Sequence, residues 1–417
     1  MRPSQGRRRG FESRLSLVFI AIITINQSKK MKIGTVKEIK DNTETRVGLT
    51  PGSVKELTAM GHEVFVQQGA GRPSQISDEE YRQAGAEIVS NAQEVWERVN
   101  LMVKVKEPQK EELKYLREDL TLFTYLHLAS PANKELTMAA MESKGTFIAY
   151  ETIVLENRTT PLLAPMSEVA GQRIIDVCSE YLASPKGIAN KMVNRIKGMA
   201  GKILIIGGGV VGKNSAYSAL GRGADVVILE LREEQRKQLQ EELQPLADAF
   251  GANLKILEST KEVLAREVQD ADMIIGSIYI KGARADRLIK KEMLDVMKEG
   301  AVIGDVAIDQ GGVCEFSKAT DIKEPSIIVQ GPQTGKKIIY IGIPNIPATV
   351  GATSTHALNA ATIEYVKKYA EGGMKAVLAD PAFKQGVNVA KGYIVLEPVA
   401  KEHGLEDKFK PIEKLFG

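Results

Sequence analysis

A single glycine-rich turn constrains the fold of this chain more than any other feature. The turn is Gly207-Gly-Gly209-Val-Val-Gly212, a G-x-G-x-x-G pattern that lies between an apolar strand, Lys202–Ile206, and a helical stretch. An acidic residue, Glu230, ends the next predicted strand. Strand, glycine turn, helix and strand-terminal acid in this order predict a βαβ unit that binds a dinucleotide at the turn.

Each residue of the turn has its own predicted role. Gly207 permits the tight turn, Gly209 lets the backbone approach a pyrophosphate, and Gly212 lets the helix and the strand pack closely. The N-terminal end of the helix, at Val210 and Val211, offers backbone N–H groups and a partial positive charge to the phosphates. The turn is therefore expected to hold the phosphates of the cofactor.

The strand-terminal acid favours one of the two nicotinamide dinucleotides. Glu230 can accept hydrogen bonds from the ribose hydroxyls and would repel a 2′-phosphate, which favours NAD over NADP. Arg232 lies two residues later and could soften this preference.

The rest of the chain alternates short apolar runs with helical stretches, a pattern typical of mostly parallel α/β proteins. We expect two Rossmann-like domains, with a doubly wound, parallel-sheet NAD domain (161–345) inserted into a discontinuous substrate domain (31–160 and 346–417). Helices are expected over 167–182, 213–221 and 354–369. Strands are expected at 31–35, 63–67, 101–105, 120–126, 146–150, 202–206, 225–229, 273–277, 301–306, 327–330 and 338–343.

Charge and apolar character set the first thirty residues apart. The chain has 417 residues and a net charge of +3, but residues 1–30 contain seven basic side chains and one acidic one, so the remainder carries −3. That balance implies no nucleic-acid partner. The apolar run Leu15–Ile25 is too short to span a bilayer, which needs about 20 residues. Either Met31 is the true start, or residues 1–30 are an export signal or anchor; we exclude them from the fold.

Two cysteines, Cys178 and Cys314, cannot form a disulfide framework or a cysteine-based zinc site. A reducing, cytoplasmic setting is therefore expected, and no metal site is predicted.

Among four histidines, His127 is the one placed for chemistry. It follows the strand 120–126, where side chains at the carboxyl end of a parallel strand face a crevice, and its pKa suits proton transfer near neutrality. A hydrogen-bonded structural role is the alternative. We expect His62 and His403 at the surface and His356 in helix packing.

Four further charged positions are candidates for substrate contacts. Lys104 and Lys106 alternate with valines and share one face of a strand, which is typical either of a solvated edge or of a site at the strand end. Arg46 is a surface charge or a carboxylate anchor. Asp309 follows a strand and precedes a double glycine. Spacing alone does not decide among these roles.

Together these residues identify a family. From Met31 the chain closely resembles alanine dehydrogenase, within the family that also contains the NAD(P) transhydrogenase α subunit. The matching segments are Thr-Arg-Val-Gly-Leu-Thr-Pro (45–51), Gly-His-Glu-Val (61–64), Val-Lys-Val-Lys-Glu-Pro (103–108), Leu-His-Leu-Ala (126–129), Tyr-Glu-Thr (150–152), Ala-Pro-Met-Ser-Glu-Val-Ala-Gly (164–171), the glycine turn, Val-Ala-Ile-Asp-Gln-Gly-Gly (306–312), Asn345-Ile-Pro and Thr353-Ser-Thr. The histidine of Leu-His-Leu-Ala and the aspartate of Ile-Asp-Gln favour the dehydrogenase branch.

The resemblance implies a reaction: L-alanine, NAD⁺ and water give pyruvate, ammonium and NADH, reversibly. It implies that Arg46 holds the substrate carboxylate and that Lys106 contacts the carboxylate or the carbonyl oxygen. His127 would be the acid–base group, with Asp309 an essential carboxylate near the nicotinamide; either could accept the proton of the amine. Cofactor contacts are expected at Ser167, Ile278, Tyr279 and Asn345, in addition to the glycine turn and Glu230.

Several segments depart from the family pattern and leave the amino acid open. Residues 184–202 are more basic and more helical in character than usual, residues 330–337 resemble an altered hairpin, and the loop after Ile278 also differs. Glycine with glyoxylate, another small 2-oxo acid, a transhydrogenase-like subunit and a non-catalytic NAD-binding sensor are the alternatives. The resemblance further suggests a homo-oligomer, commonly a hexamer.

Overall fold

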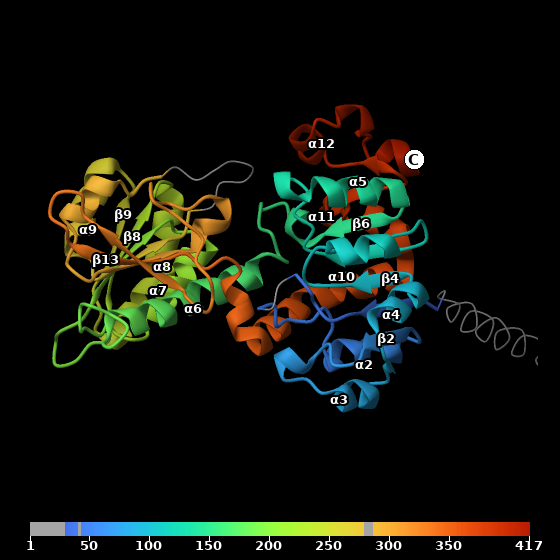
Figure 1. The fold of residues 1–417 in the computed structure, drawn as a ribbon, viewed down its shortest axis with the longest axis horizontal. Coiled ribbons are helices and arrows are strands. Elements are labelled where there is room, and N and C mark those ends of the chain that lie inside the picture. Colours follow the sequence, from blue (N-terminus) through green and yellow to red (C-terminus); the bar gives the residue numbers. More distant parts are fainter. Residues whose placement is uncertain (1–29, 41–42, 279–286) are drawn as a thin grey trace, which may run out of the picture. The chain divides into compact units, whose positions relative to one another are not determined.

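The chain divides into two compact units. The computed structural model describes residues 30–40, 43–278 and 287–417 (Figure 1). Unit 1 comprises the chain up to Glu38, Val47–Arg158 and Asn359–Gly417; unit 2 comprises Ile39–Arg46 and Thr159–Leu358. Unit 2 is thus inserted into unit 1, and a short early segment belongs to it as well.

Unit 1 is built on an eight-stranded sheet in the order β15-β14-β6-β5-β4-β1-β2-β3. The strands from β6 to β3 are parallel, whereas β14 and β15 add an antiparallel edge. The strands are β1 (Lys32–Thr35), β2 (Glu63–Gln67), β3 (Glu87–Val89), β4 (Leu101–Val103), β5 (Thr121–Thr124), β6 (Thr146–Ala149), β14 (Val387–Ala390) and β15 (Tyr393–Ile394). The α-helices are α2 (Pro51–Ala59), α3 (Asp78–Gln83), α4 (Ala92–Arg98), α5 (Lys134–Ser143), α11 (Pro381–Gln385), α12 (Glu397–His403) and α13 (Glu413–Phe416).

Helix starts in unit 1 follow from local hydrogen bonding. Thr50 caps α2 by accepting a hydrogen bond from the backbone N–H of Ser53, and Pro51 occupies the first helical turn. Ser77 and Glu80 form a reciprocal capping box at α3. The core lies around Trp96, which is fully buried, and joins residues of β4, β5, β6 and α5.

Unit 2 is built on a seven-stranded sheet in the order β12-β13-β11-β10-β7-β8-β9, parallel except for β12. The strands are β7 (Lys202–Ile206), β8 (Asp225–Glu230), β9 (Leu254–Glu258), β10 (Met273–Gly276), β11 (Val302–Asp305), β12 (Ser326–Gln330) and β13 (Lys337–Ile341). The helices are α6 (Ala164–Leu182), α7 (Val210–Leu220), α8 (Glu233–Phe250), α9 (Lys261–Asp270) and the start of α10 (Gly351–Ala379), which is kinked at Gly373 and belongs to unit 1 from Asn359 onward.

Both faces of the unit 2 sheet are covered. In β7, Ile203 and Ile205 pack with residues of α6, α7 and α8, whereas Leu204 and Ile206 pack with residues of α9 on the other face. Successive strand residues point to opposite faces, so an uninterrupted apolar strand requires helices on both sides. This confirms the predicted α/β class with a doubly wound parallel sheet.

Local predictions had mixed outcomes. The helix predicted from residue 213 begins at Val210, inside the glycine turn, and the hairpin at 330–337 joins β12 and β13. The helical character of residues 184–202 is wrong: they contain no helix and place Asn190 and Lys197 at φ of 49° and 48°. Left-handed backbone at two non-glycine residues is incompatible with a continuing helix.

Three histidine predictions are also wrong. His62 and His403 are buried, at 4% and 6% exposure, because each ring meets distant backbone. The Met31 backbone N–H donates to His62 Nδ1 (3.3 Å), and burial lowers the pKa of His62. His403 Nε2 lies 2.7 Å from the carbonyl oxygen of Leu128. His356, expected in packing, is exposed on α10.

Candidate functional site

The glycine turn of unit 2 has the geometry that the sequence predicts. β7 ends at Ile206, Gly207 follows with φ of 103°, and α7 begins at Val210. A Cβ placed on Gly212 would lie 1.9 Å from the carbonyl oxygen of Gly207, so any side chain there would displace backbone. Gly207 and Gly212 are therefore required by the fold itself.

Gly209 is different, because the fold does not require it. A Cβ placed on Gly209 would meet no atom within 4 Å, and its φ of −72° is open to any residue. Gly209 and Val210 are exposed at the N-terminus of α7, where backbone N–H groups lack partners within the helix. An open position in front of a helix N-terminus fits a pyrophosphate that approaches the backbone closely.

Glu230 is held beside this turn. Its side chain is largely buried, and its two carboxylate oxygens accept hydrogen bonds from the backbone N–H groups of Gly208 (3.0 Å) and Arg232 (2.9 Å). The Arg232 guanidinium, 70% exposed, lies 3.4 Å from the same carboxylate. The acid is fixed next to the backbone of the glycine turn, with an exposed cation at its side.

Ile278 also lies against the turn, since a Cβ on Gly207 would come within 3.3 Å of its side chain. Tyr279, the other contact predicted from this loop, lies outside the described residues. Ser167, expected at the cofactor carboxamide, is partly buried in the first turn of α6.

Asp309 is exposed on a short 3₁₀ helix, η6 (Val306–Gln310), which follows β11 and packs against α6. Asp305, at the end of β11, anchors the far side of this segment. Its carboxylate accepts hydrogen bonds from the Val313 backbone N–H (3.1 Å), the Ser317 hydroxyl (2.6 Å) and the Tyr340 hydroxyl (3.0 Å). Burial raises the pKa of Asp305 despite these donors. The exposed acid is thus presented by a loop that a buried acid holds.

Arg46 is buried in unit 2 and is already paired with the carboxylate of Glu44. Its Nε and Nη2 donate to the two oxygens of Glu44, at 2.8 and 2.6 Å, and Nη2 also donates to Asn345 Oδ1 (2.5 Å). Asn345, at φ of 56°, returns a hydrogen bond from Nδ2 to Glu44 (2.9 Å). Nη1 faces the sulfur of Met166 at 3.2 Å, a weak acceptor. The bidentate pair fixes the plane of the guanidinium.

The backbone segments that carry Lys106 and His127 lie side by side in unit 1. Lys106 follows β4 and His127 follows the neighbouring parallel strand β5, so both lie at strand carboxyl ends. The segments are joined directly: the Tyr125 backbone N–H donates to the Val105 carbonyl (3.3 Å), and Thr124 Oγ1 donates to the Lys106 carbonyl (3.0 Å).

His127 is held by its backbone, and its ring remains accessible. Its φ is 47°, and its backbone N–H donates to Glu151 Oε1 at 2.6 Å, while Nδ1 lies 3.9 Å from the same oxygen. The ring stacks on Tyr125, with centroids 5.8 Å apart. With 42% of its side chain exposed, the His127 ring is accessible to a bound molecule.

The solvated-edge interpretation of the two lysines is wrong. Lys104 is 1% exposed and Lys106 is 8% exposed. Lys104 is paired with Glu38 and Glu112, which the alternation of lysine and valine could not reveal.

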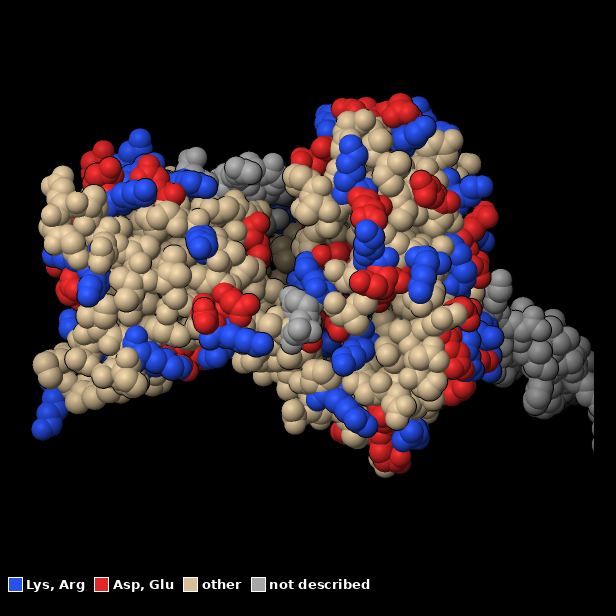
Figure 2. All heavy atoms as spheres, viewed as in Figure 1, with Lys and Arg blue, Asp and Glu red and all other residues tan. Residues whose placement is uncertain are grey.

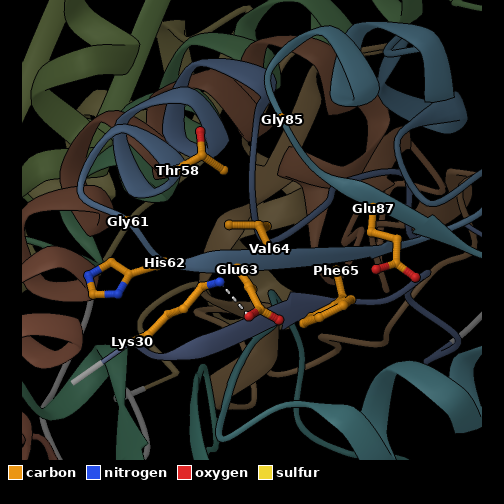
Figure 3. Close-up of a pocket in the computed structure, with 9 residues that line it drawn as sticks. All are labelled: Lys30, Thr58, Gly61, His62, Glu63, Val64, Phe65, Gly85 and Glu87. Carbon is orange, nitrogen blue, oxygen red and sulfur yellow. Dashed lines mark ion pairs between the residues drawn. The ribbon is translucent and has the colours of Figure 1, made fainter.

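A pocket in unit 1 lies outside the predicted site residues. The pocket in Figure 3, in unit 1, is lined by Lys30, Glu63 and neighbours, and includes none of the predicted site residues. Lys30 and Glu63 form an ion pair across 2.7 Å there. On the face in Figure 2, acidic and basic side chains are interspersed. No cluster of three metal-ligating side chains occurs in the described part of the chain. Nor does any described helix combine the length and apolar character needed to cross a bilayer.

Comparison with known proteins decides the family. Residues 34–170 match the N-terminal domain and residues 175–397 the C-terminal domain of the family model alanine dehydrogenase/PNT. The chain is 43% identical to alanine dehydrogenase from Bacillus subtilis over 387 residues, which is 92% of this chain and 97% of that protein. The chain belongs to the alanine dehydrogenase/PNT family.

Further relatives agree with this assignment. Alanine dehydrogenase from Methanococcus maripaludis is 41% identical, over 92% of this chain and 99% of that protein. Among solved structures, an L-alanine dehydrogenase superposes with a TM-score of 0.82 at 39% identity, covering 90% of this chain and 99% of that one. A transhydrogenase from Sinorhizobium meliloti, at a TM-score of 0.69 and 24% identity, covers 88% of this chain and 99% of that one and shares the fold.

Within this family framework, sequence reasoning missed the acids that hold the predicted residues. Glu151, which binds the His127 backbone, lies inside the Tyr-Glu-Thr match and could have been singled out. Glu44 stands one residue before the Thr-Arg-Val match, and only the structure pairs it with Arg46. Glu38, which contacts the Lys106 segment, had no signal of its own.

Proposed function

We propose that this protein catalyses the reversible, NAD-dependent oxidative deamination of L-alanine to pyruvate and ammonium. One observation carries the proposal. A chain 43% identical to an alanine dehydrogenase combines an open dinucleotide turn in unit 2 with an exposed histidine and a lysine at one sheet edge of unit 1.

The residues that would hold the cofactor are those around the glycine turn. Gly209 and the first turn of α7 would receive the pyrophosphate, Glu230 the ribose hydroxyls, and Ser167 the carboxamide. When bound, the nicotinamide cofactor supplies the acceptor for the hydride that leaves C2 of alanine.

Substrate binding falls to two cations. Arg46 would take the carboxylate of alanine, whose oxygen can replace the weakly accepting sulfur of Met166 at Nη1, while Glu44 keeps the guanidinium plane fixed. Lys106 would hold the carboxylate or the developing carbonyl oxygen at C2.

Proton transfer is assigned to two exposed groups. The ammonium of alanine must lose a proton before the hydride leaves, and His127 or Asp309 accepts it. Water then adds to the imine carbon, and His127 moves a proton between the hydroxyl and the nitrogen so that ammonia leaves and pyruvate forms. Alanine, NAD⁺ and water thus yield pyruvate, ammonium, NADH and one proton.

The proposal extends to the assembly and its setting. A homohexamer and a cytoplasmic location follow from the family resemblance, and both described cysteines are free thiols. Light scattering of the purified full chain measures the assembly directly; a monomeric mass contradicts this part of the proposal.

The test follows NADH at 340 nm with pyruvate and ammonium, with glyoxylate beside pyruvate and NADPH beside NADH. We expect turnover with pyruvate that falls about 10²–10⁴-fold in His127→Ala and in Asp309→Asn. His356→Ala, which removes another exposed histidine, is the matched control and should retain activity. Turnover confined to glyoxylate would move the substrate, and tight NADH binding without turnover would favour a sensor.

A further inference from the structure

A buried charge cluster lies behind Lys106, and the proposed reaction does not use it. Lys104 Nζ is 3.1 Å from Glu38 Oε2 and 2.9 Å from Glu112 Oε1. The exposed fractions of the three side chains are 1%, 1% and 4%. Two carboxylates thus share one ammonium inside unit 1, an arrangement whose desolvation cost makes it weak as a device for stability alone.

The two carboxylates have different second partners. Glu112 Oε2 accepts a hydrogen bond from the Gln109 backbone N–H (2.9 Å) at the start of a 3₁₀ helix. Glu38 instead binds the segment that carries the predicted substrate lysine. Its Oε1 accepts from the Val105 backbone N–H (2.6 Å), and its Oε2 accepts from the Lys106 backbone N–H (3.3 Å).

Glu38 supplies hydrogen-bond acceptors to the chain just beyond the end of β4. β4 ends at Val103, β1 ends at Thr35, and the chain bends at residues 105 and 106, so β1 offers no strand pairing there. The β5 side continues to hold the bend through the carbonyl groups of Val105 and Lys106. The Glu38 carboxylate accepts hydrogen bonds from the N–H groups of the bend, so both sides of the bend are fixed.

The ammonium of Lys104 lies against this carboxylate in the interior and compensates its charge. An isolated buried carboxyl group would take up a proton and lose its strength as an acceptor. Although burial opposes it, the two acids raise the pKa of Lys104, which therefore remains a cation. Hydrogen bonds to an ionised acceptor are shorter and stronger than neutral ones, as the 2.6 Å bond from Val105 illustrates.

We propose that Glu38 is a positioning residue for substrate binding: paired with Lys104, it fixes the backbone bend at Val105 and Lys106 and so aims the Lys106 ammonium at the substrate. This inference rests on the proposed function. Glu38 is buried in unit 1 and acts through the Lys106 segment, so its effect should fall on binding of the keto acid and leave NADH binding unchanged.

The experiment compares Glu38→Gln with Glu112→Gln in the full chain. Each variant removes one negative charge from the same ammonium at an equally buried position, and neither changes the length of the side chain. Only Glu38→Gln takes a carboxylate away from the backbone N–H groups of Val105 and Lys106; Glu112→Gln affects the N–H of Gln109 instead. The measurements are KM for pyruvate, KM and Kd for NADH, kcat, and Tm.

We expect Glu38→Gln to raise KM for pyruvate about 10–100-fold, with NADH affinity within about twofold of the unchanged protein. Glu112→Gln should leave KM for pyruvate within about threefold of the value for the unchanged protein, even where its Tm falls as much as that of Glu38→Gln. Glu38→Asp keeps a carboxylate and should retain part of the pyruvate affinity that Glu38→Gln loses, which would support a role for the carboxylate. Equal KM shifts in both glutamine variants, or none in either, would overturn the proposal.

A readout without catalysis separates this inference from the proposed function. Hydrogen–deuterium exchange of peptides covering residues 104–107 should speed up in Glu38→Gln and not in Glu112→Gln. If the unchanged protein fails to turn over pyruvate while this exchange difference is present, the proposed function fails and the anchoring of the bend stands. If turnover is normal and exchange is equal in the two variants, the positioning role fails alone.

Discussion

Replacing Gly209 by alanine separates what the glycine turn does for a cofactor from what it does for the fold. A methyl group there would meet no protein atom within 4 Å, and φ of −72° is comfortable for alanine. The free energy of unfolding should therefore change by no more than about 1 kcal/mol, with a small gain possible from the stiffer unfolded chain.

Cofactor binding should respond very differently. The methyl group would occupy the space in front of the α7 N-terminus and keep a pyrophosphate from the backbone N–H groups. Loss of one such hydrogen bond to a charged group is worth about 1.5–3 kcal/mol, and tenfold in affinity corresponds to about 1.4 kcal/mol. Calorimetric titration should then show NADH binding weakened about 10–100-fold.

Gly212→Ala is the matched contrast within the same turn. Its Cβ would lie 1.9 Å from the Gly207 carbonyl oxygen, so backbone must move, at a cost of about 1–3 kcal/mol. In a unit of this size that lowers Tm by about 3–10 °C. A Gly209→Ala protein that binds NADH as tightly as the original, with an unchanged Tm, would refute the placement of the pyrophosphate at this turn.

Two further changes test separate parts of the site, and a third tests an ion pair at Asp272, directly before β10. Glu151→Gln should lower kcat about tenfold by weakening the charge-assisted bond that holds the His127 backbone, with NADH affinity unchanged in titrations. Glu230→Ser should weaken NADH binding about tenfold and reduce the preference for NADH over NADPH. Calorimetric titration with both dinucleotides measures the two affinities, and an unchanged ratio of these affinities would contradict the role of Glu230. Burial alone would raise the pKa of Asp272, but hydrogen bonds and ion pairs, including one from Lys191 at 2.8 Å, hold that pKa below 3.8. The ionised Asp272 therefore stabilises the folded protein above this pH, and the stabilisation is lost on acidification. Urea unfolding should accordingly show Asp272→Asn less stable than the parent at pH 7, with the difference shrinking below pH 4.

Strand positions could be predicted from sequence because their causes are local. Lys202–Ile206 and Glu63–Gln67 were predicted to the residue, since apolar runs bounded by glycine or charge mark buried parallel strands. The glycine turn was equally readable, because Gly207 and Gly212 answer local steric demands and Gly209 leaves the space before the helix N-terminus open.

Burial and pairing could not be predicted, because their partners are remote in the chain. Lys104 has the same local pattern whether it is solvated or buried, and its partner Glu38 lies 66 positions earlier. His403 reads as a tail residue, yet it binds a carbonyl 275 positions away. Glu44 shares this character only in part: its partner Arg46 is two residues away, but its other partner, Asn345, lies 301 positions along the chain.

The short segment Ile39–Arg46 has consequences for anyone who divides this chain into pieces. A fragment of residues 159–358 would contain the entire seven-stranded sheet, yet Asn345 would lose both Glu44 and Arg46 as partners. Such a fragment would keep its dinucleotide turn and lack the arginine assigned to the substrate. Unit 2 is therefore encoded by two separate segments of the chain, so transferring it into a relative requires exchange of residues 39–46 together with 159–358. Adding a peptide of residues 39–46 to the 159–358 fragment should restore the missing partners of Asn345.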